Sequence, residues 1–262
     1  MRISSAGCLA TALAAWSLAA CASHPAAPDP SPRLIDDFET YAVGRPPEGG
    51  PWRLYAVNGR AVIDDTRAAS GRQSVRIDLA GKGGVFLFAE GGPLFPAARD
   101  AMSGRMKVWL QAGPAEDVHW TLIEGRGLRR SDGHTGLVRF GGQHPAPGGG
   151  SRLMSNYETP DGYADPAAPL SDCWAHAGES EAMPEGRWVD VAWRIGPQGL
   201  MLSLDGRAIS GPDVVVLGQG CLHQPGTYVW EIPAMERVSI GWETYQPGAP
   251  RTLWIDDVRI GD

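Results

Sequence analysis

The sequence lacks the patterns that mark several large classes of protein. It has no run of basic residues and a formal net charge of −7, so we expect no nucleic-acid partner. No stretch after residue 33 repeats apolar residues at helical spacing, which argues against long amphipathic helices. The motifs Gly-x-Ser-x-Gly, His-Glu-x-x-His and the phosphate loop are absent. No strand carries the paired carboxylates, about 5 Å apart, that a retaining glucanase needs.

The N-terminus has the three parts of an export signal. Residues 1–20 contain a basic start, an Ala/Leu-rich apolar stretch that is short for a membrane span, and small residues. The ending Leu-Ala-Ala-Cys matches the bacterial lipobox, which predicts cleavage before Cys21 and lipidation of its thiol. The alternative is an ordinary secretory signal with a chance cysteine. Residues 21–33 then form a tether rich in Pro, Ala and Ser. Because Ala22 rather than aspartate follows, the sorting rule of Gram-negative bacteria favours the outer membrane.

Cysteine is scarce, with four copies in the chain. Cys173 and Cys221 are the two that remain after the predicted lipidation site, in an exported context where thiols tend to pair. A disulfide between them would close a 48-residue loop and contribute about 4 kcal/mol by the chain-entropy model. The alternative is two separate buried thiols. A zinc site is disfavoured, because His176 and His223 lie near the cysteines without a zinc-site spacing.

The rest of the chain reads as short strands. It contains 35 Gly and 22 Pro, which punctuate about eleven runs of period-two apolar residues. One run places Val189, Val191, Trp193 and Ile195 on one face, and Asp205-Gly206 supplies a hairpin turn. Between residues 144 and 187 the sequence is loop-rich, and strand-like only around 152–159. We therefore predict an all-β antiparallel sandwich, a single domain over residues 34–262.

The triplet Ile-Asp-Asp occurs in strand-like runs near both ends of this domain. Because side chains alternate along a strand, one aspartate of each pair should face inward. A buried carboxylate must be paired or bound to a metal, since its desolvation is costly. Which of Asp256 and Asp257 faces inward is not decided by the sequence.

Three motifs carry a family resemblance: "DDFETYAVG", "SGRQSVRI" and the terminal "WIDDVRI". They resemble the concanavalin A-like jelly-roll superfamily. The further motifs "LMSNYET", "SDCW", "MPEGRWVDVAW" and "IGWETYQ" resemble bacterial relatives of the fungal cellulose-induced secreted protein, which is similar to glucuronan lyases. The resemblance covers roughly residues 34–262. It implies a jelly-roll sandwich whose first and last strands lie side by side.

The resemblance also implies a structural calcium ion near the paired termini. Calcium takes six to eight oxygen ligands, and the matching positions are Glu39, a backbone oxygen near Ser70, and Asp256 or Asp257. The alternative is that these acids are solvated or paired with arginine, either Arg76 or Arg259.

Polar residues that could meet a sugar chain occur in four of the central runs. Arg139, Gly141 and Gln143 share one strand face, and Asn156 shares a face with Glu158 while Tyr157 points the other way. A polyuronide lyase needs groups that neutralise a carboxylate and a base and an acid that move protons. The candidates for these roles are Arg139, Gln143, Asn156, His119, Tyr157 and Tyr245. The candidates for sugar contacts are Trp120, Glu124, Trp242 and Glu243.

Two functions are compatible with this inventory. The first is a monomeric cell-envelope lipoprotein, attached to the membrane through its lipid alone, that binds polysaccharide on a concave sheet. The second is a polysaccharide lyase that cleaves a uronic-acid polymer by β-elimination. A third alternative is a structural envelope protein without a ligand. Carbohydrate binding is favoured because it requires only the fold and a groove, whereas a lyase also requires a precise catalytic geometry.

Overall fold

The chain forms β-strands almost throughout in the computed structural model, which describes residues 33–97, 101–112, 118–144, 152–178, 181–197, 199–210, 220–222 and 230–261. The predicted signal peptide, the lipidation site Cys21 and nearly all of the tether lie outside the described residues. Residues 31–262 make one compact unit by their internal contacts. No helix in the described part of the chain is long and apolar enough to cross a membrane.

The strands follow the period-two runs of the sequence, because β-branched and aromatic residues pack well on a pleated surface. They are β1 (Arg33–Asp36), β2 (Arg53–Asp64), β3 (Ser74–Glu90), β4 (Met102–Leu110), β5 (Val118–Leu128), β6 (Thr135–His144), β7 (Arg152–Thr159), β8 (Ser171–His176), β9 (Trp188–Gly196), β10 (Gly199–Leu204), β11 (Arg207–Ala208), β12 (Gly220–Leu222), β13 (Ala234–Thr244) and β14 (Arg251–Gly261). A single turn of 3₁₀ helix, η1 (Pro160–Tyr163), joins β7 to β8.

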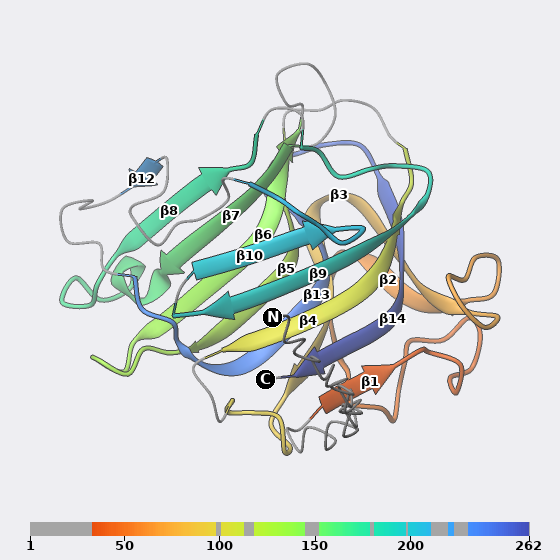
Figure 1. The fold of residues 1–262 in the computed structure, drawn as a ribbon, viewed down its shortest axis with the longest axis horizontal. Helices are drawn as coiled ribbons and strands as arrows, with labels where there is room; N and C mark the ends of the chain where they lie inside the picture. Colours follow the sequence, from red (N-terminus) through yellow and green to blue (C-terminus); the bar gives the residue numbers. More distant parts are fainter. Residues whose placement is uncertain are drawn as a thin grey trace, which may run out of the picture. The chain divides into compact units, whose positions relative to one another are not determined.

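The strands form one curled antiparallel sheet, in the order β11-β10-β9-β4-β14-β3-β13-β5-β6-β7-β8-β12, with β1 beside β14 and β2 beside β3. In Figure 1, β9, β10 and β4 cross over β5, β6 and β7, so the curled sheet folds into two layers. The two layers pack on each other, because a side chain at Gly125 of β5 would meet Ile195 of β9. This is the predicted jelly-roll sandwich, and its terminal strands pair as the resemblance implied.

Strand β3 passes from one layer to the other. Its first half pairs with β14 from Val75 to Leu79, and its second half pairs with β13 from Gly83 to Glu90. The strand changes layers at a glycine-rich corner. Gly83 has a φ of 149°, and a Cβ there would lie 2.3 Å from the carbonyl oxygen of Val57. Glycine is required at this corner, as it is at other tight bends between sheets.

The core lies between the two layers. Val189, Val191, Trp193 and Ile195 are all buried, which confirms the predicted face of this strand. The largest fully buried side chains include Trp120, Trp242, Tyr157 and Phe140.

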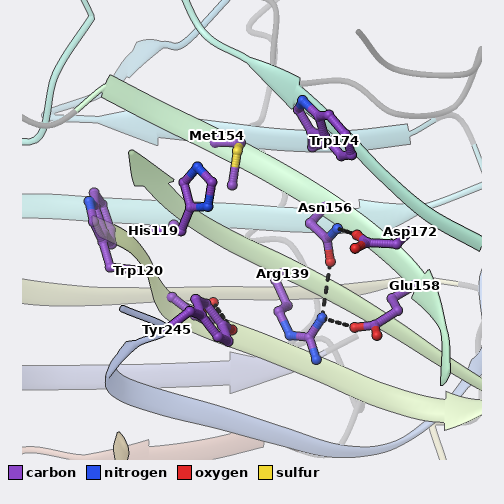
Figure 2. A pocket seen from close by; sticks show the side chains of 11 residues that line it. His119, Trp120, Arg139, Met154, Asn156, Glu158, Asp172, Trp174 and Tyr245 are labelled. Carbon is purple, nitrogen blue, oxygen red and sulfur yellow. Dashed lines mark hydrogen bonds and ion pairs between the residues drawn. The ribbon is translucent and has the colours of Figure 1, made fainter. Parts of the chain in front are cut away.

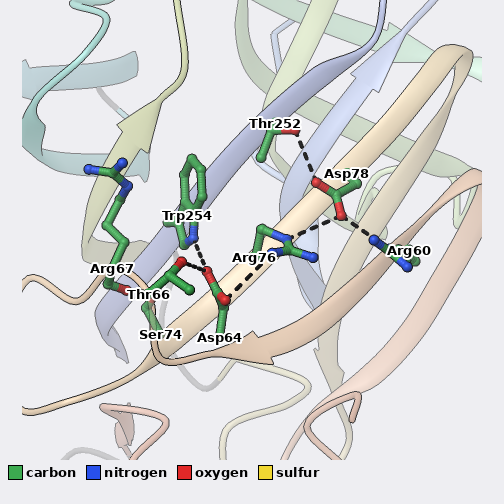
Figure 3. A network of polar contacts seen from close by, with 9 residues as sticks. All are labelled: Arg60, Asp64, Thr66, Arg67, Ser74, Arg76, Asp78, Thr252 and Trp254. Carbon is green, nitrogen blue, oxygen red and sulfur yellow. Dashed lines mark hydrogen bonds and ion pairs between the residues drawn. The ribbon is translucent and has the colours of Figure 1, made fainter. Parts of the chain in front are cut away.

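A polar network joins β2, β3 and β14 (Figure 3). The carboxylate of Asp64 accepts hydrogen bonds from Trp254 Nε1 at 2.5 Å and from Thr66 Oγ1 at 2.6 Å. Arg76 contacts both Asp64 and Asp78, and Asp78 also accepts a hydrogen bond from Thr252. Arg76 is therefore engaged on this network, through Asp64 and Asp78.

Candidate functional site

Cross-strand register builds a row of functional side chains. Glu124 of β5 lies opposite Arg139 of β6, which lies opposite Asn156 of β7, which in turn lies opposite Trp174 of β8. Strands β7 and β8 alternate strictly between buried and partly exposed residues. Neighbours in register share a face, so all four side chains point away from the core.

A pocket of about 430 Å³ opens over this row. Figure 2 shows the side chains of β5, β6, β7 and β8 converging on it, together with Tyr245, which follows β13. It is lined by His119, Trp120, Thr121, Arg139, Gly141, Met154, Asn156, Glu158, Asp172, Trp174 and Tyr245. The lining combines aromatic faces with amide, carboxylate and guanidinium groups, which is the chemistry that binds sugar rings and hydroxyls.

A second pocket, of about 440 Å³, adjoins the first. It is lined by Leu54, Tyr55, Phe86, Phe88, Glu124, Arg139, Arg237, Ser239, Glu243 and Tyr245. The two pockets share Arg139 and Tyr245. Together they form one groove that runs across β8, β7, β6, β5, β13 and β3 to the edge strand β2. We call this surface the groove.

Arg139 stands where the two pockets meet and is held by three partners. Its Nε lies 2.9 Å from Glu124 Oε2, and its Nη1 contacts Glu158 Oε2 and Asn156 Oδ1, the latter at 3.0 Å. The three ionic side chains are 15–17% exposed. Burial by itself lowers the pKa of Arg139, but the neighbouring Tyr245, Glu124 and Glu158 raise that pKa above its ordinary value. The guanidinium is permanently charged and fixed in place.

Tyr245 and Glu243 form a second polar pair beside Arg139. The Tyr245 hydroxyl lies 2.7 Å from Thr121 Oγ1 and is hydrogen-bonded to the Glu243 carboxyl. Burial raises the pKa of Tyr245 well above its usual value, although Arg139 opposes this shift. Burial also raises the pKa of Glu243. Tyr245 therefore holds its proton at neutral pH and can donate a hydrogen bond, but it is not a ready base.

Seven of the predicted site residues line the groove. His119, Arg139, Asn156 and Tyr245 meet in the first pocket, while Glu124 and Glu243 line the second. Trp120 is 1% exposed and forms part of the first pocket wall.

Three predicted residues lie elsewhere. Tyr157 is fully buried on the core side of β7, as its opposite phase to Asn156 requires, and it packs on Trp230. Trp242 is 2% exposed and stacks on Trp120 with ring centroids 4.5 Å apart, so its face is not available to a sugar. Gln143 shares the face of Arg139 but is not among the lining residues of either pocket.

Strand β8 was missed by the sequence reasoning, which treated its segment as loop. This strand brings Asp172 and Trp174 into the first pocket. The alternation of buried Ser171, Cys173 and Ala175 with larger polar or aromatic residues was the available signal. Pro and Gly on both sides of so short a run concealed it. Tyr55, Phe88 and Arg237 were also missed, because only the tertiary fold places β3 beside β13 and β2 on the other side of β3.

The residues predicted to bind calcium gather around the loop of residues 69–73. Asp256 faces inward and is fully buried, and its carboxylate accepts backbone hydrogen bonds from Ala69 at 2.8 Å, Ser70 at 3.2 Å and Asp257 at 2.8 Å. A bulge after Asp256 turns Asp257 outward, with φ at 50°, where it accepts a hydrogen bond from Ser70 Oγ. The buried carboxylate of Asp256 is therefore stabilised by hydrogen bonds from three backbone amides.

Glu39 is satisfied in the same way by the amides of Arg72 and Gln73. No group of three or more acidic, histidine or cysteine side chains in the described part of the chain is arranged to hold a metal ion. These carboxylates face amide donors and do not form an oxygen cage, so the present arrangement does not fit calcium without a change in the loop. The calcium ion stays a prediction.

Cys173 is buried and disulfide-bonded. Strand β12 pairs with β8 in the register that places Cys221 opposite Cys173. This register is compatible with the predicted Cys173–Cys221 bond, which stays a prediction because the Cys221 side chain lies outside the described part of the structure.

Comparisons with known proteins agree with this architecture. The family model for the Cip1-like core domain, which is polysaccharide lyase-like, matches residues 48–262. The solved structure of the cellulose-induced protein Cip1 has a TM-score of 0.55 at 21% identity, covering 87% of this chain and 96% of that one. The endo-β-1,4-glucuronan lyase of the fungus Trichoderma reesei has a TM-score of 0.55 at 12% identity, covering 85% and 94%. At these identities the two structures show a shared fold alone. None of the curated proteins compared with the chain matches it significantly. The chain belongs to the polysaccharide lyase-like family of Cip1-like core domains.

Proposed function

We propose that this protein is a carbohydrate-binding lipoprotein of the cell envelope, which holds a polysaccharide chain in the groove. One observation carries the proposal: two adjoining pockets share Arg139 and Tyr245. A groove that continues on both sides of a central pair suits a polymer better than a small isolated ligand. Trp174 and His119 provide ring faces on one side, and Tyr55 and Phe88 provide them on the other.

The binding test uses residues 31–262 and a panel of soluble oligosaccharides in a calorimetric titration. Trp174→Ala should weaken binding by about tenfold or more, because it removes a stacking face from the first pocket. The matched control is Trp188→Ala. Trp188 is also partly exposed at a sheet surface, where it packs edge-on against Trp109, and it lines neither pocket. Equal losses in both variants, or no binding to any glycan, would contradict the proposal.

The second candidate function is β-elimination on a polyuronide. It is supported by His119, Arg139 and Tyr245 lying in one pocket and by the lyase-like family. We rank it lower because Arg139 already neutralises two carboxylates and because Tyr245 retains its proton. Ultraviolet absorbance of the unsaturated product tests it on glucuronan and alginate. Product formation that Tyr245→Phe abolishes would make the protein a lyase.

The envelope location is proposed from the sequence of the leader. Replacing Cys21 by serine should abolish incorporation of labelled fatty acid into the protein, because the thiol that would be acylated is gone. Fatty-acid labelling that persists in the Cys21→Ser variant would show that Cys21 is not the lipidation site.

A further inference from the structure

We infer that the groove selects uncharged polysaccharide and rejects chains that carry a carboxylate on each sugar. This inference rests on the proposed function and names the ligand class of the same site. It also predicts that the protein does not bind well to the polyuronides that its lyase-like family suggests as substrates.

The first support is the charge of the lining. Besides His119, the groove contains four carboxyl groups and two guanidinium groups, which are Glu124, Glu158, Asp172, Glu243, Arg139 and Arg237. Burial raises the pKa of Glu243, which favours its neutral form. Even with Glu243 neutral, three carboxylates face two cations. A polyanion would therefore meet a surface of its own sign, which costs binding energy.

The second support is that both cations are already engaged. Arg139 is fixed by Glu124 on one side and by Glu158 on the other. The Arg237 guanidinium lies 3.8 Å from Glu124 Oε1 and stacks 5.1 Å from the ring of Phe88. A substrate carboxylate at Arg139 would compete with the two protein carboxylates that already pair with this guanidinium, and at Arg237 it would lie close to the carboxylate of Glu124. Displacing Glu124 or Glu158 from Arg139 would leave a largely buried acid without its main partner, which is unfavourable.

The third support is that the side-chain amide of Asn156, which could otherwise donate hydrogen bonds to a sugar carboxylate, already has partners within the protein. Its Oδ1 accepts a hydrogen bond from Arg139. Its Nδ2 donates to Asp172 Oδ1 at 2.6 Å and to the carbonyl oxygen of Cys173 at 3.1 Å. The amide is thus oriented by its neighbours, with both of its polar ends in use. Acidic groups such as Asp172 remain well suited to accept hydrogen bonds from sugar hydroxyls.

The test compares ligands that differ only at one carbon. Cello-oligosaccharides and β-1,4-linked glucuronic acid oligosaccharides have the same backbone, and they differ in a hydroxymethyl group or a carboxylate at C6. Manno- and mannuronate oligosaccharides form a second such pair. Titration calorimetry with residues 31–262 should give at least tenfold tighter binding to an uncharged member than to its uronate counterpart. Added salt should reduce the preference, because it screens the repulsion.

Charge variants show where the preference arises. Glu158→Gln removes one carboxylate from Arg139 and should reduce several-fold the ratio of the dissociation constants for the uronate and the uncharged oligosaccharide. Glu48→Gln makes the same change in total charge at an exposed residue that lines neither pocket and should leave the preference unaltered.

The outcomes distinguish the two proposals. If no oligosaccharide of either kind binds, the proposed function fails. If a uronate binds as tightly as its uncharged counterpart or is cleaved, the protein recognises glycans but the inferred ligand class is wrong. A preference that Glu48→Gln narrows as much as Glu158→Gln would also overturn the inference, because it would place the selectivity outside the groove.

Discussion

Replacing Arg139 by methionine tests whether the centre of the groove is an ion network or a loose surface pair. The change keeps an apolar stem of similar length but removes the cation from Glu124 and Glu158, whose side chains are each 15% exposed. Two poorly hydrated carboxylates would then lack their shared cation, and Glu124 would keep only its longer contact with Arg237, at 3.8 Å. Breaking a buried ion pair in this way costs about 3–5 kcal/mol, whereas an exposed pair costs about 0–1 kcal/mol.

The magnitude follows from the contacts. A charge pair about 4 Å apart is worth roughly 4 kcal/mol at the effective dielectric constant of a site near the surface, and Arg139 makes two such contacts. The free energy needed to desolvate the three groups offsets much of this attraction. We therefore expect Arg139→Met to lower the free energy of unfolding by about 4 kcal/mol. For a domain of this size that corresponds to a fall in Tm of roughly 8–16 °C.

The assay is thermal and urea unfolding of residues 31–262, followed by tryptophan fluorescence. A triple variant, with Arg139→Met, Glu124→Gln and Glu158→Gln, serves as the matched control because it removes the two stranded charges as well. It should recover to within about 2 kcal/mol of the natural protein. A loss below about 1 kcal/mol in the single variant, or a triple variant no more stable than the single one, would refute the reasoning.

Three further predictions concern stability outside the groove. Asp190→Asn should lower the free energy of unfolding by about 1–2 kcal/mol at pH 7, since Asp190 pairs with Arg105 and Lys107, and Arg105 is largely exposed. Because the hydrogen bond from Arg105 lowers the pKa of Asp190, the difference in stability between the variant and the natural protein should shrink in acid-unfolding curves as pH falls below about 4. A difference that persists at pH 2 would argue against the pairing. Cys173→Ser should lower stability by about 4 kcal/mol under oxidising conditions and by much less in a reducing buffer, where both proteins lack the bond; mass spectrometry of tryptic fragments identifies the partner cysteine. Calcium and EDTA should both leave the Tm unchanged, because the carboxylates of Glu39 and Asp256 already accept hydrogen bonds from backbone amides; a calcium-dependent gain in stability, about 2.7 kcal/mol at a hundred times the dissociation constant, that Asp256→Asn abolishes would instead establish a calcium site.

Local pattern predicted much of the fold. The alternation in "WVDVAWRIG" is the alternation of β9, and "RLMSNYET" is β7 with Asn156 and Glu158 outward and Tyr157 inward. These predictions succeeded because the period of a strand fixes which residues share a face, whatever the partner strand is. Pairing of the two terminal strands was implied by the resemblance alone.

The loop-rich segment after β7 was harder to interpret. Strand β8 is six residues long and follows several Pro and Gly residues, so its own pattern was too short to stand out. Its place is fixed by pairing with β7, which puts Trp174 beside Asn156.

By itself, the sequence determined an all-β chain, the faces of its clearer strands and most of the polar residue types in the groove. Only the tertiary structure decided what those residues do. It paired Arg139 with two carboxylates, buried Trp242 against Trp120, and turned Asp256 inward through a bulge next to Asp257. The physical reason is that period two selects a face, whereas register, bulges and sheet curvature select the neighbours on that face. Charge balance and access to solvent depend on those neighbours, and so does the ligand class that we propose for the groove.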